Sequence, residues 1–246
     1  MRSNRSTSRL LPVWSLLLLV GCLAPVEATA QPETVMPATP SMTASPTPIP
    51  PTLIPTPTAT MPPTSTPEPA GCLKPPEDYT RIEVNNQTLN RRTLAMLTHA
   101  QEIYGGEIEL SGYALTQGSY TDSVAASFGT HAGGGAVDLS VMRQGTYTVL
   151  WDDVPRLLHA LRVAGFAAWL RDYGELYPDS SIHIHAMAIG DRELSSAAQD
   201  QLTGPAGYFR GYSGLPFEDG DLPTPDRFGG PILCQWMIDL GHQDLR

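Results

Sequence analysis

A proline- and threonine-rich stretch over residues 31–70 limits the part of this chain that can form a packed domain. The stretch holds 13 prolines and 10 threonines, with no aromatic residue and no lysine or arginine. It cannot bury enough apolar surface to fold and favours extended polyproline conformations. At about 3.1 Å per residue, such a spacer could reach on the order of 120 Å. We interpret residues 23–70 as a disordered tether, which O-glycosylation could turn into a stalk.

An export signal precedes the tether. The chain starts with three basic residues, Arg2, Arg5 and Arg9. The apolar stretch 10–23 that follows is too short for a comfortable membrane span and is typical of a secretory signal. It ends in Leu-Val-Gly-Cys at residues 19–22, the pattern of a bacterial lipobox, which predicts a signal peptide over 1–22 and lipidation of Cys22. The rival is ordinary cleavage after Ala-Thr-Ala at residues 28–30.

Residues 71–246 remain as one domain, long enough for a proper core. Apart from Cys22, this chain has only Cys72 and Cys234, one near each end of that domain. In an oxidising compartment the simplest use of the pair is a disulfide, and two buried free thiols are the alternative. The net charge of −10 argues against nucleic acid as a partner and leaves no basic patch for anionic lipid.

Four potential metal ligands fall in two short segments. His131 precedes a glycine run and stands seven residues before Asp138, and His183 and His185 are separated by one residue. Residues 136–141 and 182–189 are predicted strands, so His183 and His185 point to the same face. Two imidazoles and a carboxylate suit a catalytic Zn²⁺, which takes three protein ligands and keeps one position for water. Any one of these histidines alone would more simply be an ordinary core or surface residue.

The remaining pattern predicts a mixture of helices and strands. Apolar spacing indicates an amphipathic helix over 89–104 that ends at Gly105, and a helix that starts at Asp152–Asp153 and ends at Gly165. Ser195 is expected to cap a third helix running to Thr203. Further strands are predicted at 107–113 and 166–170. Because no βαβ alternation is visible, we expect an α+β fold with a small, mostly antiparallel sheet and flanking helices. From Gly207 onward we expect a surface segment pinned by Cys234 and Trp236.

The two histidine segments resemble the motifs of the zinc D-Ala-D-Ala carboxypeptidases, whose superfamily also includes lysostaphin-type endopeptidases and the Hedgehog signalling domain. The first motif is His131-x-x-Gly-x-Ala-x-Asp138, and the second is His183-x-His185. The resemblance implies zinc ligation by His131, Asp138 and His185. It also implies a catalytic role for His183 and for Asp179, which stands four residues before it. The fold implied is Hedgehog/DD-peptidase-like, and the residues covered are most of 80–205.

The sequence departs from the family pattern in the catalytic positions. Ala114 follows Ser-Gly-Tyr where the family carries an arginine, Gly129 replaces a serine, and Asp179 is shorter than the usual glutamate. Arg143 or Arg171 could supply the missing charge. The resemblance thus predicts a zinc peptidase acting on peptidoglycan stem peptides, as a carboxypeptidase or an endopeptidase, and the lipobox predicts that it is extracytoplasmic and membrane-anchored. The alternatives are a zinc-containing wall-binding module without catalysis and a domain with a merely structural zinc.

The lipobox generates a direct test. The wild-type protein should fractionate with membranes, and a Cys22→Ala variant should lose this association because it has no thiol to lipidate. Fractionation of cells expressing each form, with immunodetection, measures the change. A Cys22→Ala protein that remains equally membrane-bound would favour cleavage after Ala30 instead.

Overall fold

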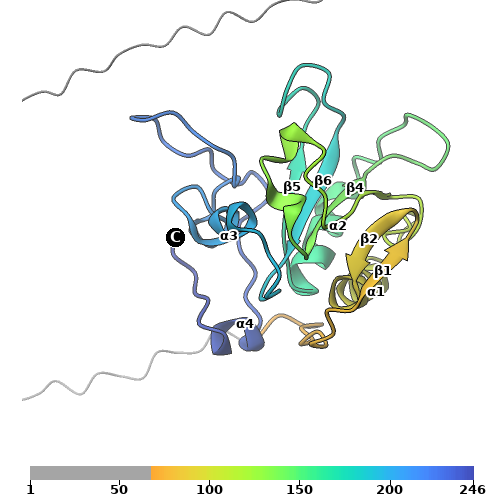
Figure 1. Cartoon of the computed structure of the whole chain (residues 1–246), viewed down its shortest axis with the longest axis horizontal. Helices are drawn as coiled ribbons and strands as arrows, with labels where there is room; N and C mark the ends of the chain where they lie inside the picture. Colours follow the sequence, from red (N-terminus) through yellow and green to blue (C-terminus); the bar gives the residue numbers. More distant parts are fainter. Residues whose placement is uncertain (1–67) are drawn as a thin grey trace, which may run out of the picture. The chain divides into compact units, whose positions relative to one another are not determined.

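The computed structural model describes residues 68–246 of the chain (Figure 1). The predicted signal peptide, Cys22 and nearly all of the tether lie outside these residues. The regular elements are two helices on one side of the sheet, α1 (Arg91–Tyr104) and α2 (Val154–Val163), and two later helices, α3 (Ser196–Thr203) and α4 (Gln235–Asp239). The strands are β1 (Arg81–Val84), β2 (Gln87–Asn90), β3 (Leu115–Gln117), β4 (Ala136–Ser140), β5 (Phe166–Arg171) and β6 (His183–Ala188). Three short 3₁₀ helices complete the list: η1 (Ala125–Ser127), η2 (Thr130–Ala132) and η3 (Tyr208–Arg210).

The strands form two antiparallel sheets. A four-stranded sheet has the order β3-β4-β6-β5, and β1 and β2 form a separate hairpin. All pairings in both sheets are antiparallel. The expectation of an α+β domain with a small antiparallel sheet and flanking helices is therefore confirmed. The narrower expectation of a Hedgehog-like fold stays a prediction.

The two faces of the four-stranded sheet have different partners. Helices α1 and α3 lie on opposite sides of the strands (Figure 1). Side chains such as Val137, Leu139 and Ile184 pack with α1 and α2 in the larger core. Their sequence neighbours on the strands point the other way and pack with α3 and the C-terminal segment in a second core. This alternation follows from the two-residue period of a strand. One end of the second face is not covered by apolar packing, and it carries the polar side chains of Asp138, His183, His185 and Arg171.

The start of α1 differs from the prediction. The helix begins at Arg91, and Asn90 caps it by accepting a hydrogen bond from the Thr93 amide at 2.8 Å. Leu89, predicted to be helical, belongs to β2. The β1–β2 hairpin was not predicted, although its turn residues Asn85 and Asn86 both have positive φ, as a type I′ turn requires.

The strand predicted at 107–113 is wrong. Residues 110–114 form turns, and the strand of this region, β3, starts at Leu115. Ile108 and Leu110 are fully buried, so the alternation that suggested a strand reflects apolar side chains entering the core from a turn. The strands predicted at 136–141, 166–170 and 182–189 and the helix capped by Ser195 are confirmed to within a residue or two.

The C-terminal segment from Gly207 onward, predicted to lie on the surface, also contributes to the core. Tyr208, Phe209 and Trp236 are buried in the second core. A disulfide joins Cys72 to Cys234 across a sequence separation of 162, as predicted. This bond indicates an oxidising, extracytoplasmic compartment. Among residues 68–246, no helix has the length and hydropathy needed to cross a membrane.

The disulfide should stabilise the domain strongly. Closing so long a loop contributes about 4–5 kcal/mol in the chain-entropy model, so a Cys72→Ser/Cys234→Ser double variant should lose free energy of unfolding of that order. Urea unfolding of wild type and variant, both in chains beginning at residue 68, measures the loss. Titration of the denatured, unreduced wild type should find no free thiol, and two thiols per chain would contradict the pairing.

Candidate metal centre

The register of three antiparallel strands assembles the candidate site on the second face of the sheet. Asp138 of β4 pairs with His185 of β6, which pairs in turn with Trp169 of β5. The next row joins Ser140, His183 and Arg171 in the same way. Because residues in cross-strand pairs share a face, Asp138, His183, His185 and Arg171 lie together, as the alternation in the sequence suggested for the two histidines.

His131 reaches this face from the loop before β4. It lies in η2, and the glycine run that follows turns the chain back into the sheet. Gly133 has no room for a side chain, since an added Cβ would lie 2.2 Å from the carbonyl oxygen of Glu193. Gly135 adopts φ +78°, a left-handed conformation that favours glycine. The glycines therefore allow the close loop packing that places His131 beside Asp138.

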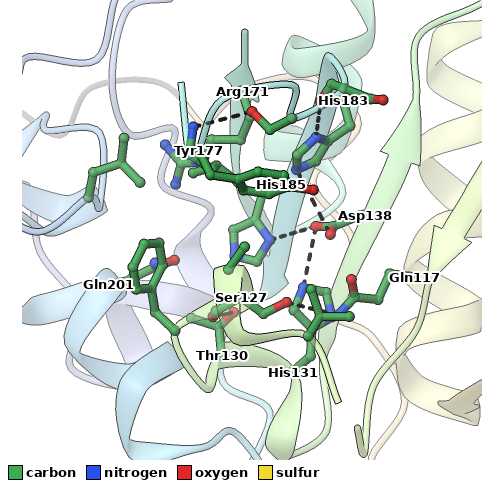
Figure 2. A pocket seen from close by; sticks show the side chains of 17 residues that line it. Gln117, Ser127, Thr130, His131, Asp138, Arg171, Tyr177, His183, His185 and Gln201 are labelled. Atoms are coloured by element: carbon green, nitrogen blue, oxygen red, sulfur yellow. Dashed lines mark hydrogen bonds and ion pairs between the residues drawn. The ribbon is translucent and has the colours of Figure 1, made fainter. Parts of the chain in front are cut away.

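Three ligand atoms converge on one point (Figure 2). Asp138 Oδ1 lies 3.3 Å from His131 Nε2 and 2.8 Å from His185 Nδ1. One atom from each of the three residues lies within 4.8 Å of the others, a spacing that could hold a metal ion. In a tetrahedral zinc site with bonds of about 2.0–2.1 Å, neighbouring ligand atoms are about 3.3 Å apart. One observed distance equals that value and the other is about 0.5 Å shorter, so the residues fit such an ion after a small shift.

The hydrogen bonds of His131 orient it as a ligand. Its Nδ1 donates to the carbonyl oxygen of Gly118 at 2.7 Å, which turns Nε2 toward Asp138. Nε2 is buried and makes no hydrogen bond to any described residue. Metal-bound histidines usually donate their second ring nitrogen to a carbonyl or carboxylate in this way. The close polar neighbour of Nε2 is Asp138 Oδ1 at 3.3 Å, without the geometry of a hydrogen bond, and a metal ion between the two atoms would bind both.

Burial and charge set the protonation of the group. Burial alone would raise the pKa of Asp138, but His131 and His185 outweigh it and hold that pKa well below its usual range. Burial lowers the pKa of His185 to about 4, against the opposing pull of Asp138. Burial also acts against charge on His131, yet the Asp138 carboxylate prevails and raises its pKa. At neutral pH the site therefore offers a carboxylate and a neutral His185, both forms that bind metals. The raised pKa of His131 favours its protonated form, so a metal ion would have to displace a proton from that histidine.

His183 lies beside this group without being part of it. Its Nε2 is 3.8 Å from Asp138 Oδ2, and its Nδ1 donates to the Ser181 carbonyl at 2.8 Å. The donated proton occupies Nδ1, so Nε2 is left as the nitrogen that can accept a proton on the side of Asp138. The position agrees with the prediction that His183 assists at the site rather than binding the metal.

Asp179 is not brought to the centre. It lies in the loop between β5 and β6, is exposed, and is not among the residues that line the pocket around the metal group. The Ser180 amide donates to the Tyr177 carbonyl at 3.0 Å, Pro178 stands second in this turn, and Asp179 has φ +70° at the third position. These are features of a type II turn. The geometry thus places Asp179 in a turn outside the pocket, and its catalytic role stays a prediction.

The pocket also contains residues to which the sequence patterns assigned no role. It is walled by the β5–β6 loop and the segment before His131, and its lining includes Gln117, Ser127, Thr130, Tyr177, Ser181 and Gln201. Gln117 owes its place to an irregularity between β3 and β4: Leu115 pairs with Leu139, but Gln117 pairs with Asp138. Such a bulge redirects a side chain, and three residues of strand give no sequence signal for it.

The two arginines considered as substitutes for the missing family arginine lie in different places. Ala114 itself is fully buried in the larger core, so a charged side chain at this position would be enclosed by apolar groups. Arg143 is exposed and pairs with Glu107 at 3.0 Å. Arg171 is buried and lines the pocket. Only Arg171 is therefore placed to act on a ligand.

A second cluster of ligand-type residues, Glu68, Cys72 and Cys234, has no comparable meaning. Its two sulfurs are bonded to each other, so neither is a thiolate that could bind a metal.

Comparison of the chain with protein-family models, curated proteins and solved structures finds no match. The metal centre therefore depends on the geometry of its own residues.

The ligand set can be tested by metal content. The wild type should hold one metal ion per chain, and His131→Ala, Asp138→Ala and His185→Ala should each weaken binding. Loss of supporting hydrogen bonds alone costs roughly 10–100-fold in affinity, and loss of a ligand should cost at least as much. Elemental analysis after dialysis against a competing chelator measures it. His159→Ala, which removes an exposed histidine of α2, is the control, and metal retention in Asp138→Ala would refute the site.

Proposed function

We propose that this protein is an exported, lipid-anchored zinc peptidase that acts on peptidoglycan stem peptides. The observation that supports it best is the convergence of His131, Asp138 and His185 at a pocket, with His183 beside them. Three protein ligands with a neighbouring proton acceptor are typical of hydrolytic zinc sites, whereas structural sites are closed by four. The match of both motifs to the zinc D-Ala-D-Ala carboxypeptidases agrees with this chemistry.

The donor set favours zinc over other common cations. Imidazole nitrogens suit zinc and other late transition metals, while Ca²⁺ and Mg²⁺ prefer oxygen ligands. Two of the three donors here are imidazoles, and the third is a carboxylate that carries one negative charge. When bound, zinc would polarise the scissile carbonyl and acidify a water molecule.

Among the residues that line the pocket, His183 is the best placed to move the proton. Asp138 is the only carboxylate that lines this pocket within residues 68–246, and it is a proposed ligand. His183 keeps its Nε2 free while Ser181 holds its Nδ1, so it can take a proton from water and return it to the leaving amine. Orientation by the Ser181 carbonyl favours the required tautomer.

The shape of the pocket suits an extended peptide. A hollow on one side shares Phe128, Thr130 and Gln201 with the pocket, and another on the opposite side shares Gln117 and His183. The metal group therefore lies between two connected depressions. Phe128 and Tyr177 are about half exposed at the rim, where aromatic and apolar side chains can contact a ligand.

The cellular setting in this proposal comes from the N-terminal sequence. A lipidated Cys22 followed by the tether would let the domain work at a distance from the membrane, within the wall layer that contains stem peptides. The Cys72–Cys234 disulfide supports the extracytoplasmic part of this setting.

A second candidate function is a zinc-containing module that binds wall peptides without cutting them. The position of Asp179 favours it, because the acid that the resemblance assigns to catalysis lies on the surface of a turn, outside the pocket. The two candidates differ in a single result, since only the peptidase releases products from defined stem peptides.

His183→Ala tests the peptidase proposal. Turnover should fall by roughly 10²–10⁴, the usual contribution of general acid–base catalysis, while zinc content should stay near normal because His183 is not a ligand. Chromatography of the products of defined stem peptides, together with metal analysis of the same samples, measures both. His159→Ala serves as the matched histidine control.

Asp179→Ala in the same assay decides the role of that residue. From its exposed position we expect nearly full activity. A loss comparable to that of His183→Ala would restore the role that the resemblance implies. If the zinc-loaded wild type releases no product from any stem-peptide fragment, the binding-module candidate replaces the peptidase.

A further inference from the structure

Arg171 is a buried cation without an anionic partner. Its side chain lies at the end of β5 and is only 2% exposed. Nη1 donates to the Ser213 carbonyl at 2.8 Å, but Nη2 is buried and has no hydrogen-bond partner among residues 68–246. No carboxylate of the described residues lies within ion-pair distance of the guanidinium. A buried charge in this condition is costly unless something pairs with it.

The two other buried arginines show how this chain normally satisfies such a group. Arg162 makes an ion pair with Asp226 at 2.6 Å and also donates to three carbonyl oxygens. Arg92 donates to the carbonyls of Pro75, Pro76 and Ile189 and lies 3.6 Å from Glu77. Arg92 Nε is also buried without a partner, but both of its terminal nitrogens donate to carbonyls. Arg171 differs from both arginines by having one carbonyl acceptor, no carboxylate and a terminal nitrogen without a partner among the described residues.

The guanidinium belongs to the wall of the candidate site. Arg171 pairs with His183 across β5 and β6, and it lines the same pocket as His131, Asp138 and His185 (Figure 2). Its guanidinium carbon lies 5.2 Å from the centre of the Trp169 ring, over one face of the indole, where a cation–π interaction stabilises it. Burial lowers the pKa of Arg171 to about 10, and Glu175 and Asp138 act in the opposite direction. The group therefore keeps its positive charge at neutral pH.

We propose that Arg171 is the anion-binding residue of this pocket and binds a carboxylate of the ligand. A guanidinium presents its donors as a planar fork that matches a carboxylate, so an anion in the pocket would supply the partner that Nη2 lacks. In a stem peptide, which is the ligand class of the proposed function on which this inference rests, the carboxylate is either the free C-terminus or an internal one, such as the α-carboxylate of a γ-linked glutamyl residue. Binding of the C-terminus would place the last peptide bonds near the metal group.

The test compares peptides that differ only in charge. The zinc-loaded mature chain is titrated calorimetrically with N-acetyl-Lys-D-Ala-D-Ala, with its C-terminal carboxamide, and with a C-terminally amidated γ-D-glutamyl peptide whose only free carboxylate is the α-carboxylate of the glutamyl residue. Hydrogen bonds to charged groups are worth about 1.5–3 kcal/mol, which converts to roughly tenfold to hundredfold in affinity. The peptide with the recognised carboxylate should bind tighter than the carboxamide by this factor, and whichever acid is preferred identifies the source.

Variants assign the preference to Arg171. Arg171→Met should abolish the difference between acid and amide, and Arg171→Lys should keep only part of it, because an ammonium lacks the fork. Arg143→Met is the matched control and should keep the whole difference, since Arg143 is exposed and paired with Glu107. Melting temperature and zinc content of each variant report folding. If Arg171→Met does not fold, the Lys variant provides the comparison.

Three outcomes would overturn the inference: a wild type that binds acids and amide equally, a wild type that binds none of these peptides, or an unchanged preference in folded Arg171 variants. Analysis of the recovered peptides for cleavage reports the proposed function separately. A preference for the acid that depends on Arg171, without any cleavage, would leave the inference standing while the peptidase proposal fails. Cleavage without such a preference would support the peptidase proposal and overturn the inference about Arg171.

Discussion

The site depends on one carboxylate, Asp138, held between two imidazoles on the face of an antiparallel sheet. Its side chain is only 14% exposed, and burying a charge in this way is costly without close cationic or metal partners. His131 and His185 lie within 3.3 Å of its Oδ1 and hold its pKa far below the usual range. The carboxylate can remain ionised only because both histidines are positioned for it, so the three residues act as one unit.

The position of that unit follows from strand register. Pairing of Asp138 with His185 puts both on the second face of the sheet, while their neighbours Leu139 and Ile184 pair on the opposite face within the larger core. A slip of one residue would exchange the two faces and bury the carboxylate among leucines and isoleucines. The apolar core under α1 and α2 thus specifies the register of the site, and the second core, closed by the Cys72–Cys234 disulfide, supports the same face from its other end.

Much of the site could be predicted from local sequence patterns. Alternation along a strand placed His183 and His185 on one face, and the resemblance implied His131, Asp138 and His185 as the ligands that the structure brings together. Gln117 was not predictable, because its position depends on a bulge between two strands distant in sequence.

Other differences between sequence patterns and structure have equally physical causes. Residues 107–113 alternate like a strand but enter the core as turns, since period alone cannot separate the two in a short segment. Asp179 matched a family spacing, yet it is exposed in a turn and does not line the pocket, and its catalytic role stays a prediction. The isolation of Arg171 is a property of tertiary packing, which a single sequence does not show.

X-ray absorption spectroscopy at the zinc edge of the zinc-loaded protein tests the central claim most directly. The account predicts a shell of nitrogen and oxygen donors at about 2.0–2.1 Å, with the multiple-scattering signature of two imidazoles and no sulfur. A sulfur donor at about 2.3 Å, or a shell of oxygens without imidazole, would contradict ligation by His131, Asp138 and His185.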